Sequence, residues 1–211
     1  MSSSFDIIPL SAELPTFAAV KALSDRRLRE FLRAFDIQAE FKTSFEFLES
    51  GVPAEQAKRR SPSDTDLVGI EDDSEYVRVF LEGLDGSTFL SFKTLKDDTR
   101  LDDPWWQSRL LLEDGGNDLP ELDEIKATAQ RINRLWEISR YGGSPPIIHI
   151  LYGIVAGSLA ELTNGIVTSS TWDMSRFPAT STDFFKWHLD QHSGRGTYEA
   201  KYVEAVRELQ S

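Results

Sequence analysis

Histidines are the residues of this chain with the widest chemical range, because imidazole is the commonest general base and metal ligand. His188 and His192 are four residues apart, a spacing that places two side chains on one face of a helix, as two metal ligands would be. Asp190 lies on the other side of that helix, and no His-Glu-x-x-His pattern is present. A metal-dependent enzyme that uses His188, His192 and nearby carboxylates is therefore an alternative. We favour two helix-end histidines without a site.

Other catalytic patterns are weaker. His149 lies within an apolar stretch, where we expect a neutral imidazole with one hydrogen-bond partner. Residues 153–158 lack the Gly-Lys-Ser/Thr of a phosphate loop, and their small residues four apart predict close helix packing. The chain has no Gly-x-Ser-x-Gly elbow and no Asp-x-Asp-x-Asp-Gly calcium loop, so paired carboxylates such as Asp72 and Asp73 predict a solvated surface. The sequence thus predicts no enzyme, no metal and no cofactor.

Negative charge is concentrated in the middle of the chain. Residues 64–124 hold 18 of the 35 Asp and Glu but only 5 of the 23 Lys and Arg, and the whole chain carries −12. Such a field repels nucleic acid and anionic membranes and attracts a basic protein surface. The basic run of residues 58–60 is interpreted as solvated, because the acidic stretch follows it directly. Binding to a basic protein is therefore the predicted role, and a homodimer is compatible with it.

The sequence Asp-Asp-Pro-Trp-Trp at residues 102–106 combines carboxylates with large aromatic side chains, as a protein interface does. The alternative is that both Trp residues close the core at the start of a helix. We predict a partner-binding region of eight residues: Asp97, Asp98, Asp102, Asp103, Trp105, Trp106, Glu113 and Asp114.

Composition predicts a cytoplasmic protein. The chain has no Cys, which fits a reducing compartment, and its first residues lack the basic and apolar regions of a secretory signal. The most apolar run, residues 147–162, is shorter than the roughly 20 residues of a membrane span. It is interpreted as a buried helix.

The first half of the chain predicts a helix followed by strands. Apolar residues at three- and four-residue steps predict a helix over residues 16–35, and alternation predicts a strand over 37–47, with which a short strand at 5–8 would pair. Residues 50–74 lose all periodicity and predict a long, mobile surface loop. Asp85-Gly86 between two β-rich runs, 76–81 and 87–92, predicts a hairpin.

The second half predicts mostly helices. A capping box at residues 118–121 precedes helical spacing as far as Trp136, which predicts about five turns before the glycines at 142–143. A second helix is expected from 147 to Asn164-Gly165, then a strand at 166–169, a helix capped by Thr180 and Asp183, and a last helix over 198–209. The predicted fold is one α+β domain over residues 1–211, an antiparallel sheet packed on one side by several helices. The 50–74 loop is the hinge if there are two domains.

The segment 159–189 resembles the closing segment of bacterial immunity proteins that neutralise secreted toxins. The resemblance rests on Leu-Ala-Glu-Leu-Thr-Asn-Gly-Ile-Val at 159–167, Ser-Ser at 169–170, Trp-Asp at 172–173, Phe-Pro-Ala at 177–179 and Phe-Phe-Lys-Trp at 184–187. It implies a cytoplasmic protein that binds and blocks a cognate toxin, and it carries over no contact residue. An acidic scaffold subunit of a larger assembly is a further alternative, which a large apolar surface patch would indicate.

Overall fold

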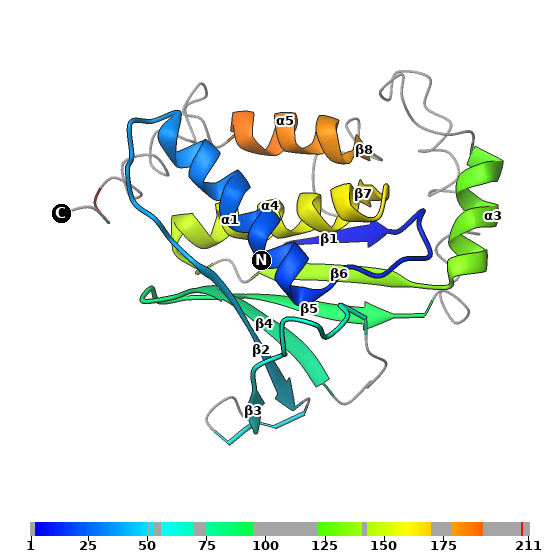
Figure 1. The fold of residues 1–211 in the computed structure, drawn as a ribbon, viewed down its shortest axis with the longest axis horizontal. Helices are drawn as coiled ribbons and strands as arrows, with labels where there is room; N and C mark the ends of the chain where they lie inside the picture. Colours follow the sequence, from blue (N-terminus) through cyan, green and yellow to red (C-terminus); the bar gives the residue numbers. More distant parts are fainter. Residues whose placement is uncertain are drawn as a thin grey trace.

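The computed structural model describes residues 3–49, 51–52, 56–69, 75–94, 122–140, 143–169, 179–191 and 208. Their strands form one eight-stranded antiparallel sheet in the order β3-β2-β4-β5-β6-β1-β7-β8 (Figure 1). The strands are β1 Ser3–Ile8, β2 Thr43–Glu49, β3 Arg59–Arg60, β4 Glu75–Leu81, β5 Thr88–Lys93, β6 Leu135–Arg140, β7 Ile166–Thr168 and β8 Ala179–Thr180. The helices longer than one residue in these ranges are α1 Phe17–Arg33, α3 Leu122–Ile132, α4 Pro146–Leu162 and α5 Ser181–Gln191. The predicted α+β class is confirmed.

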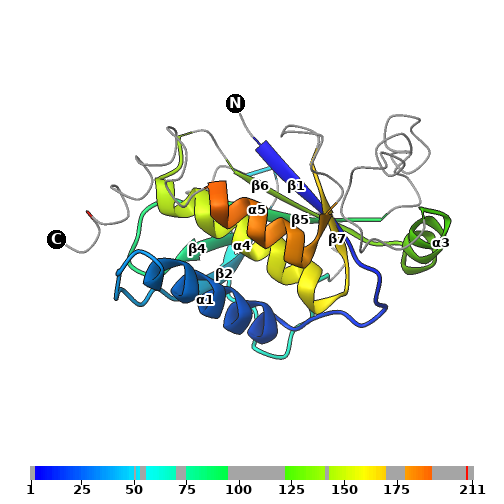
Figure 2. The same ribbon diagram turned by 90° about the horizontal axis from the view of Figure 1, so that it is seen from above.

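Three helices form a layer on one face of the sheet. The central helix, α4, lies between α1 and α5 (Figure 2), and nearly all of its residues are buried, as its apolar sequence predicts. The main core joins these helices to the side chains that alternate inward from the strands, such as Phe5, Val79 and Ile138. At one end of the opposite face, Ile125 and Ala129 of α3 form a second cluster with Ile8, Leu135 and Ile166.

Helix α1 confirms the prediction over residues 16–35, but the strand predicted over 37–47 is wrong in its first half. Thr16 caps the helix by accepting a hydrogen bond from the Ala19 amide. The chain then turns at Asp36, whose φ is 60°, and pairing begins only at Thr43. Ile37 is buried, and Ala39 and Phe41 pack against the core although this stretch pairs with no strand. In the first half of the predicted strand, the alternation of apolar and polar residues therefore reflects burial of one side of the chain and not pairing with another strand.

Strand β1 does not pair with β2 as predicted. It lies between β6 and β7, with Phe5 opposite Ile138 and Ile7 opposite Val167. The prediction failed because β6 was not recognised as a strand, which left β2 as the nearest candidate partner.

The five-turn helix predicted to run past Trp136 is also wrong. Helix α3 ends at Ile132, Asn133 takes a left-handed φ of 56°, and β6 follows. Leu135 and Trp136 continue the apolar spacing of the helix, which is why the sequence predicts them to belong to it. In the structure both are buried in a strand, as is Ile138, because β6 is enclosed between β5 and β1. Long-range pairing with two strands therefore outweighs the local helical pattern.

The predicted hairpin, the end of α4 with the strand after it, and the cap of α5 are confirmed. β4 and β5 form the predicted hairpin, with positive φ at Gly83 and Gly86. α4 ends before Asn164, whose φ is 49°, and β7 follows it. Thr180 Oγ1 accepts from the Asp183 amide at 3.2 Å and donates to its carboxylate at 3.0 Å, which is the predicted cap of α5. The capping box at 118–121 and the helix at 198–209 lie outside the described residues, Glu208 apart.

Part of the 50–74 segment is attached to the fold. β3 pairs with the end of β2, and the backbone carbonyls of Asp66 and Asp64 accept hydrogen bonds from the first amides of α1. Val68 is fully buried, and its amide donates to the Pro15 carbonyl at 2.8 Å. These described residues therefore cap α1, although the hinge role of the segment stays a prediction. Within the described ranges, no helix is both long and apolar enough to cross a membrane.

Thr43 provides a stability prediction. Its hydroxyl is buried in the core with no hydrogen-bond partner, whereas its amide donates to Asp25 at 2.7 Å. Because an unsatisfied buried hydroxyl costs about 1–3 kcal/mol, we expect the near-isosteric Thr43→Val to raise the free energy of unfolding by about 1 kcal/mol. Urea denaturation measures the change. Thr88→Val is the control and should destabilise, because the Thr88 hydroxyl donates to the Ser139 carbonyl at 2.6 Å.

Candidate functional site

The eight residues predicted to bind a partner, from Asp97 to Asp114, all lie outside the described residues. The structure does describe the elements that hold this segment. β5 ends at Lys93 before it, and α3 begins at Leu122 after it. The register of β5 therefore fixes where the chain leaves the sheet before this segment.

Two acidic segments join the sheet at the same end. β4 and β5 are antiparallel, with Val77 opposite Leu90, so the start of β4 lies beside the end of β5. Residues 70–74 lead into β4 and include Glu71, Asp72 and Asp73, while residues 95–121 follow β5. β2 also ends there, with Glu49 opposite Glu75. We call this place, where β2 ends, β4 begins and β5 ends, the acidic end of the sheet.

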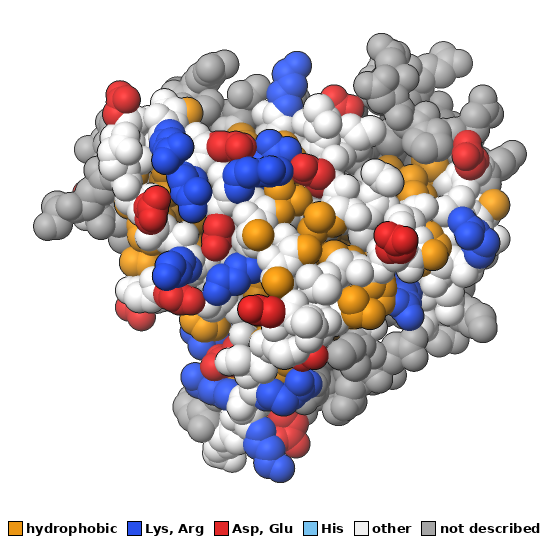
Figure 3. Space-filling view, viewed as in Figure 1, with side chains coloured by type: hydrophobic (Ala, Val, Ile, Leu, Met, Phe, Trp, Pro, Cys, Tyr) orange, Lys and Arg blue, Asp and Glu red, His pale blue; other side chains and the backbone are white. Residues whose placement is uncertain are grey.

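Several basic side chains near the acidic end are already paired. Lys93 forms a close ion pair with Glu137, and Arg59 and Arg78 both contact the Glu46 carboxylate, at 3.9 and 3.2 Å. The described residues carry 16 Lys and Arg against 20 Asp and Glu, a net −4, so most of the total of −12 belongs to residues outside them. Figure 3 shows the two signs mixed over the visible face.

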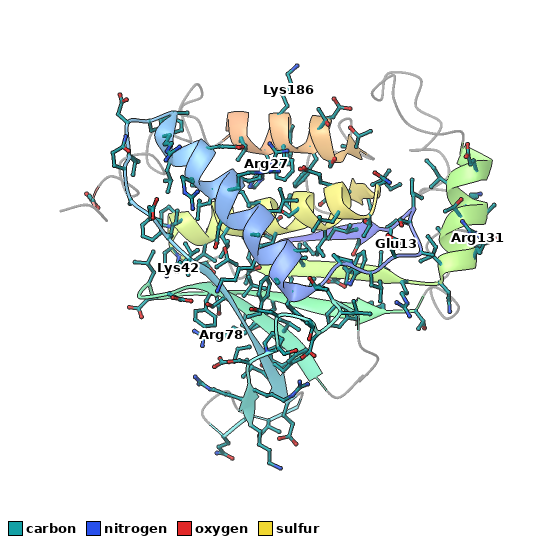
Figure 4. The ribbon with its side chains drawn as sticks, in the orientation of Figure 1. Glu13, Arg27, Lys42, Arg78, Arg131 and Lys186 are labelled. Atoms are coloured by element: carbon teal, nitrogen blue, oxygen red, sulfur yellow. The ribbon has the colours of Figure 1, made fainter. Side chains whose placement is uncertain are left out.

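An aromatic group lies on the sheet face opposite α4. Tyr76, Arg78 and Phe80 are alternate residues of β4, and Phe89 is the β5 neighbour of Arg78. The Tyr76 and Phe89 rings meet edge to face at 5.4 Å, and the Arg78 guanidinium lies 4.7 Å from the Phe80 ring centre. All four side chains are half-buried, and Figure 4 shows Arg78 on the side of the sheet away from α4. We call these four residues the aromatic–arginine patch. Sequence reasoning found the hairpin but missed the patch, although the alternation of β4 contained it.

His188 lies in the core between α5 and α4. Only 1% of it is exposed, its ring stacks on Phe184 at 5.5 Å, and its Nε2 is 3.2 Å from the Ile150 carbonyl. The other histidine of the predicted pair, His192, lies outside the described residues. Among the side chains that the structure describes, no group of three or more His, Asp or Glu is placed to hold a metal ion.

His149 is buried on α4, as its apolar surroundings predict, but it has two neighbours where one was expected. Its Nε2 is 3.0 Å from the Ser144 carbonyl and 3.2 Å from Arg140 Nη1. A protonated Nε2 donates to the carbonyl and an unprotonated Nε2 accepts from the guanidinium, so one tautomer serves one neighbour. Arg140 is itself buried and lies 5.3 Å from the Tyr152 ring centre. Sequence reasoning missed Arg140 because it lay in the misassigned β6.

Ionised side chains also fasten the helical layer. Arg27 lies between α1 and α5 (Figure 4), 2.7 Å from Glu161 of α4 and 4.8 Å from the Phe185 ring centre. Burial opposes ionisation of Arg27, but the hydrogen bond and charge of Glu161 outweigh it and raise the pKa of the guanidinium. At the cap of α1, hydrogen bonds from the side chain and backbone of Ser63 lower the pKa of Asp66. These interactions join α1 to α4 and to the segment that caps α1, and they indicate no catalytic role for Arg27 or Asp66.

Comparison with known proteins finds no family model, curated protein or solved structure that matches the chain. What the protein does must therefore follow from its own charges, topology and contacts.

Proposed function

We propose that this chain is a non-enzymatic acidic binding protein of the bacterial cytoplasm, an immunity protein that binds and blocks a cognate toxin. The observation that carries the proposal is the acidic end of the sheet. Two acidic segments that are separated by the β4–β5 hairpin join the fold at neighbouring strand ends. The hairpin thus brings the attachment points of dispersed acidic residues together.

Electrostatics explains why such an arrangement suits toxin neutralisation. A toxin that acts on nucleic acid or on an anionic membrane needs a basic surface, and an acidic inhibitor is attracted to that surface. Complementary charge raises the association rate and disfavours wrong partners. The nearby cations Lys93, Arg59 and Arg78 have acidic partners within the chain, which limits their repulsion of a basic toxin.

The segment that resembles immunity proteins has a structural place in this proposal. Its described part forms the end of α4, the turn at Asn164, strands β7 and β8, and helix α5. Phe184 and Trp187 of α5 pack around Phe5 in the core. The segment therefore acts as scaffold, and the contacts with a toxin are assigned to the acidic residues.

The proposal is tested with the product of the neighbouring reading frame as candidate toxin. We expect co-expression to relieve its toxicity and the two proteins to form a stoichiometric complex. Asp102→Lys with Asp103→Lys should slow association about 10–100-fold at low salt, because favourable steering becomes repulsive, and the difference should shrink as salt is added. Stopped-flow fluorescence at several salt concentrations measures both effects.

Asp85→Lys is the control for this experiment. Asp85 is exposed in the turn of the same hairpin, and therefore at the opposite end of β4 and β5 from the acidic end. The single change Asp102→Lys alters the net charge by the same amount as Asp85→Lys, so position alone distinguishes these two single variants. Association that is insensitive to salt, or equally affected by Asp85→Lys and Asp102→Lys, would count against the acidic end as the binding region.

The scaffold alternative has no specific observation in its favour. Among the described residues, the large hydrophobic side chains that are exposed are Leu67 and Leu162, at 43% and 37%. They lie on separate elements, the segment before β4 and the end of α4. These two side chains alone do not form a broad apolar patch.

A further inference from the structure

The aromatic–arginine patch has the composition of a protein interface but not the charge of the acidic end. Tyr, Phe and Arg are enriched at the centres of interfaces, where aromatic rings supply buried area and arginine supplies directional hydrogen bonds. Tyr76, Phe80 and Phe89 keep part of their surface accessible on the sheet face opposite α4, whose other end, at β6, β1 and β7, is covered by α3. A face of this kind gains most from packing against another sheet.

Both signs of charge surround these rings. Arg78 and Arg59 contact Glu46 on the same face, and Glu82 lies at the end of β4 with 49% of its side chain exposed. Because these charges are paired within the chain, and Glu82 with Lys21 at 3.7 Å, the face has no excess of either sign that would select a basic or an acidic partner. An identical face, turned about a two-fold axis, offers a carboxylate to each guanidinium and a ring to each ring.

We propose that two copies of this chain pair through their aromatic–arginine patches. In the dimer the rings form the centre, and Arg78 of each copy bonds to Glu46 of the other. This contact lies on the face of the sheet beside the acidic end, and it does not rest on the proposed toxin-blocking function. The dependence on salt distinguishes the dimer contact from the toxin contact. Each copy carries −12, so salt screens the long-range repulsion between copies and strengthens the dimer, whereas it weakens attraction to a basic toxin.

The purified full chain tests the proposal by sedimentation equilibrium at roughly 1–200 µM, a range that detects contacts of moderate affinity. We expect a monomer–dimer equilibrium with more dimer at about 300 mM than at about 20 mM salt. Arg78→Glu should weaken the dimer at least about tenfold, because it places like charges opposite each other. Lys186→Glu makes the same charge change on the outer side of α5 and should leave the dimer unchanged (Figure 4).

A charge swap separates loss of pairing from loss of folding. Glu46→Arg combined with Arg78→Glu and Arg59→Glu keeps both contacts of residue 46 within each copy, with the signs reversed, and restores the complement between two swapped copies. We expect the swapped chain to dimerise like the original, and mixtures of original and swapped chains to form few mixed dimers in native mass spectrometry. An original chain that stays monomeric over the whole range, or a dimer that persists after Arg78→Glu in a folded protein, would overturn the proposal.

Discussion

Phe5→Ala is expected to lower the free energy of unfolding by about 3–5 kcal/mol, the usual cost of deleting a buried aromatic side chain. Phe5 is fully buried on β1 and stacks on Tyr152 of α4 at 4.5 Å. On its other sides it meets Phe184 and Trp187 of α5 edge to face, at 4.9 and 6.1 Å. One side chain thus joins the sheet to two helices. Such a loss is a large part of the 5–15 kcal/mol that stabilises a typical domain.

Phe92→Ala is the matched control for this substitution. Phe92 lies on β5 and is only partly buried against the same core. Removing it deletes the same atoms with less loss of buried surface, so the expected destabilisation is smaller. Urea denaturation of both variants gives the comparison. If Phe5→Ala costs no more than Phe92→Ala, Phe5 does not join the layers in the way described.

The sequence predicted elements whose signals are local. Asn164 and the reciprocal pair of Thr180 and Asp183 mark helix ends, and they form the left-handed turn and the hydrogen bonds where expected. These signals depend on neighbours within four residues. Short-range chemistry therefore decides them whatever the rest of the chain does.

The errors concern partners that are distant in the chain. β6 lies between β1 and β5, and its pairing with Phe5 and Leu90 involves residues far away in sequence. Nothing in the local spacing of Leu135 and Trp136 distinguishes a strand enclosed on two edges from a helix with one buried face. Missing this strand also caused the wrong partner for β1, because adjacent strands in a sheet constrain each other.

The candidate site was predictable in its charge but not in its geometry. The acidic excess of residues 64–124 is visible in the composition. That residues 70–74 and 95–121 attach side by side follows only from the hairpin register of β4 and β5. The surroundings of Arg78 could likewise be known only from strand registers, since its neighbours Glu46 and Phe89 lie on two different strands.

Gly153→Ala is expected to destabilise the protein by about 2–3 kcal/mol, although alanine favours a helix by about 1 kcal/mol over glycine. A Cβ at Gly153 would overlap the imidazole of His188, which packs directly against the α4 backbone. At Gly157 a Cβ would lie 2.6 Å from the Phe185 ring, so both glycines allow α5 to approach α4 closely. Overpacking in a dense core therefore outweighs the gain in helix propensity.

A double-mutant cycle identifies the contact that is responsible. His188→Ala alone removes the ring and its contact with the Ile150 carbonyl, and should itself destabilise by opening a cavity. Combined with Gly153→Ala, it makes room for the new methyl group, so the two losses should sum to more than the loss in the double variant. Gly143→Ala is the control, because a Cβ there meets nothing within 4 Å and the change should stay within about 0.5 kcal/mol. Strictly additive losses for Gly153 and His188 would show that the helices do not depend on this contact. If the double variant instead loses less stability than the sum of the two single variants, His188 has a packing role between α4 and α5.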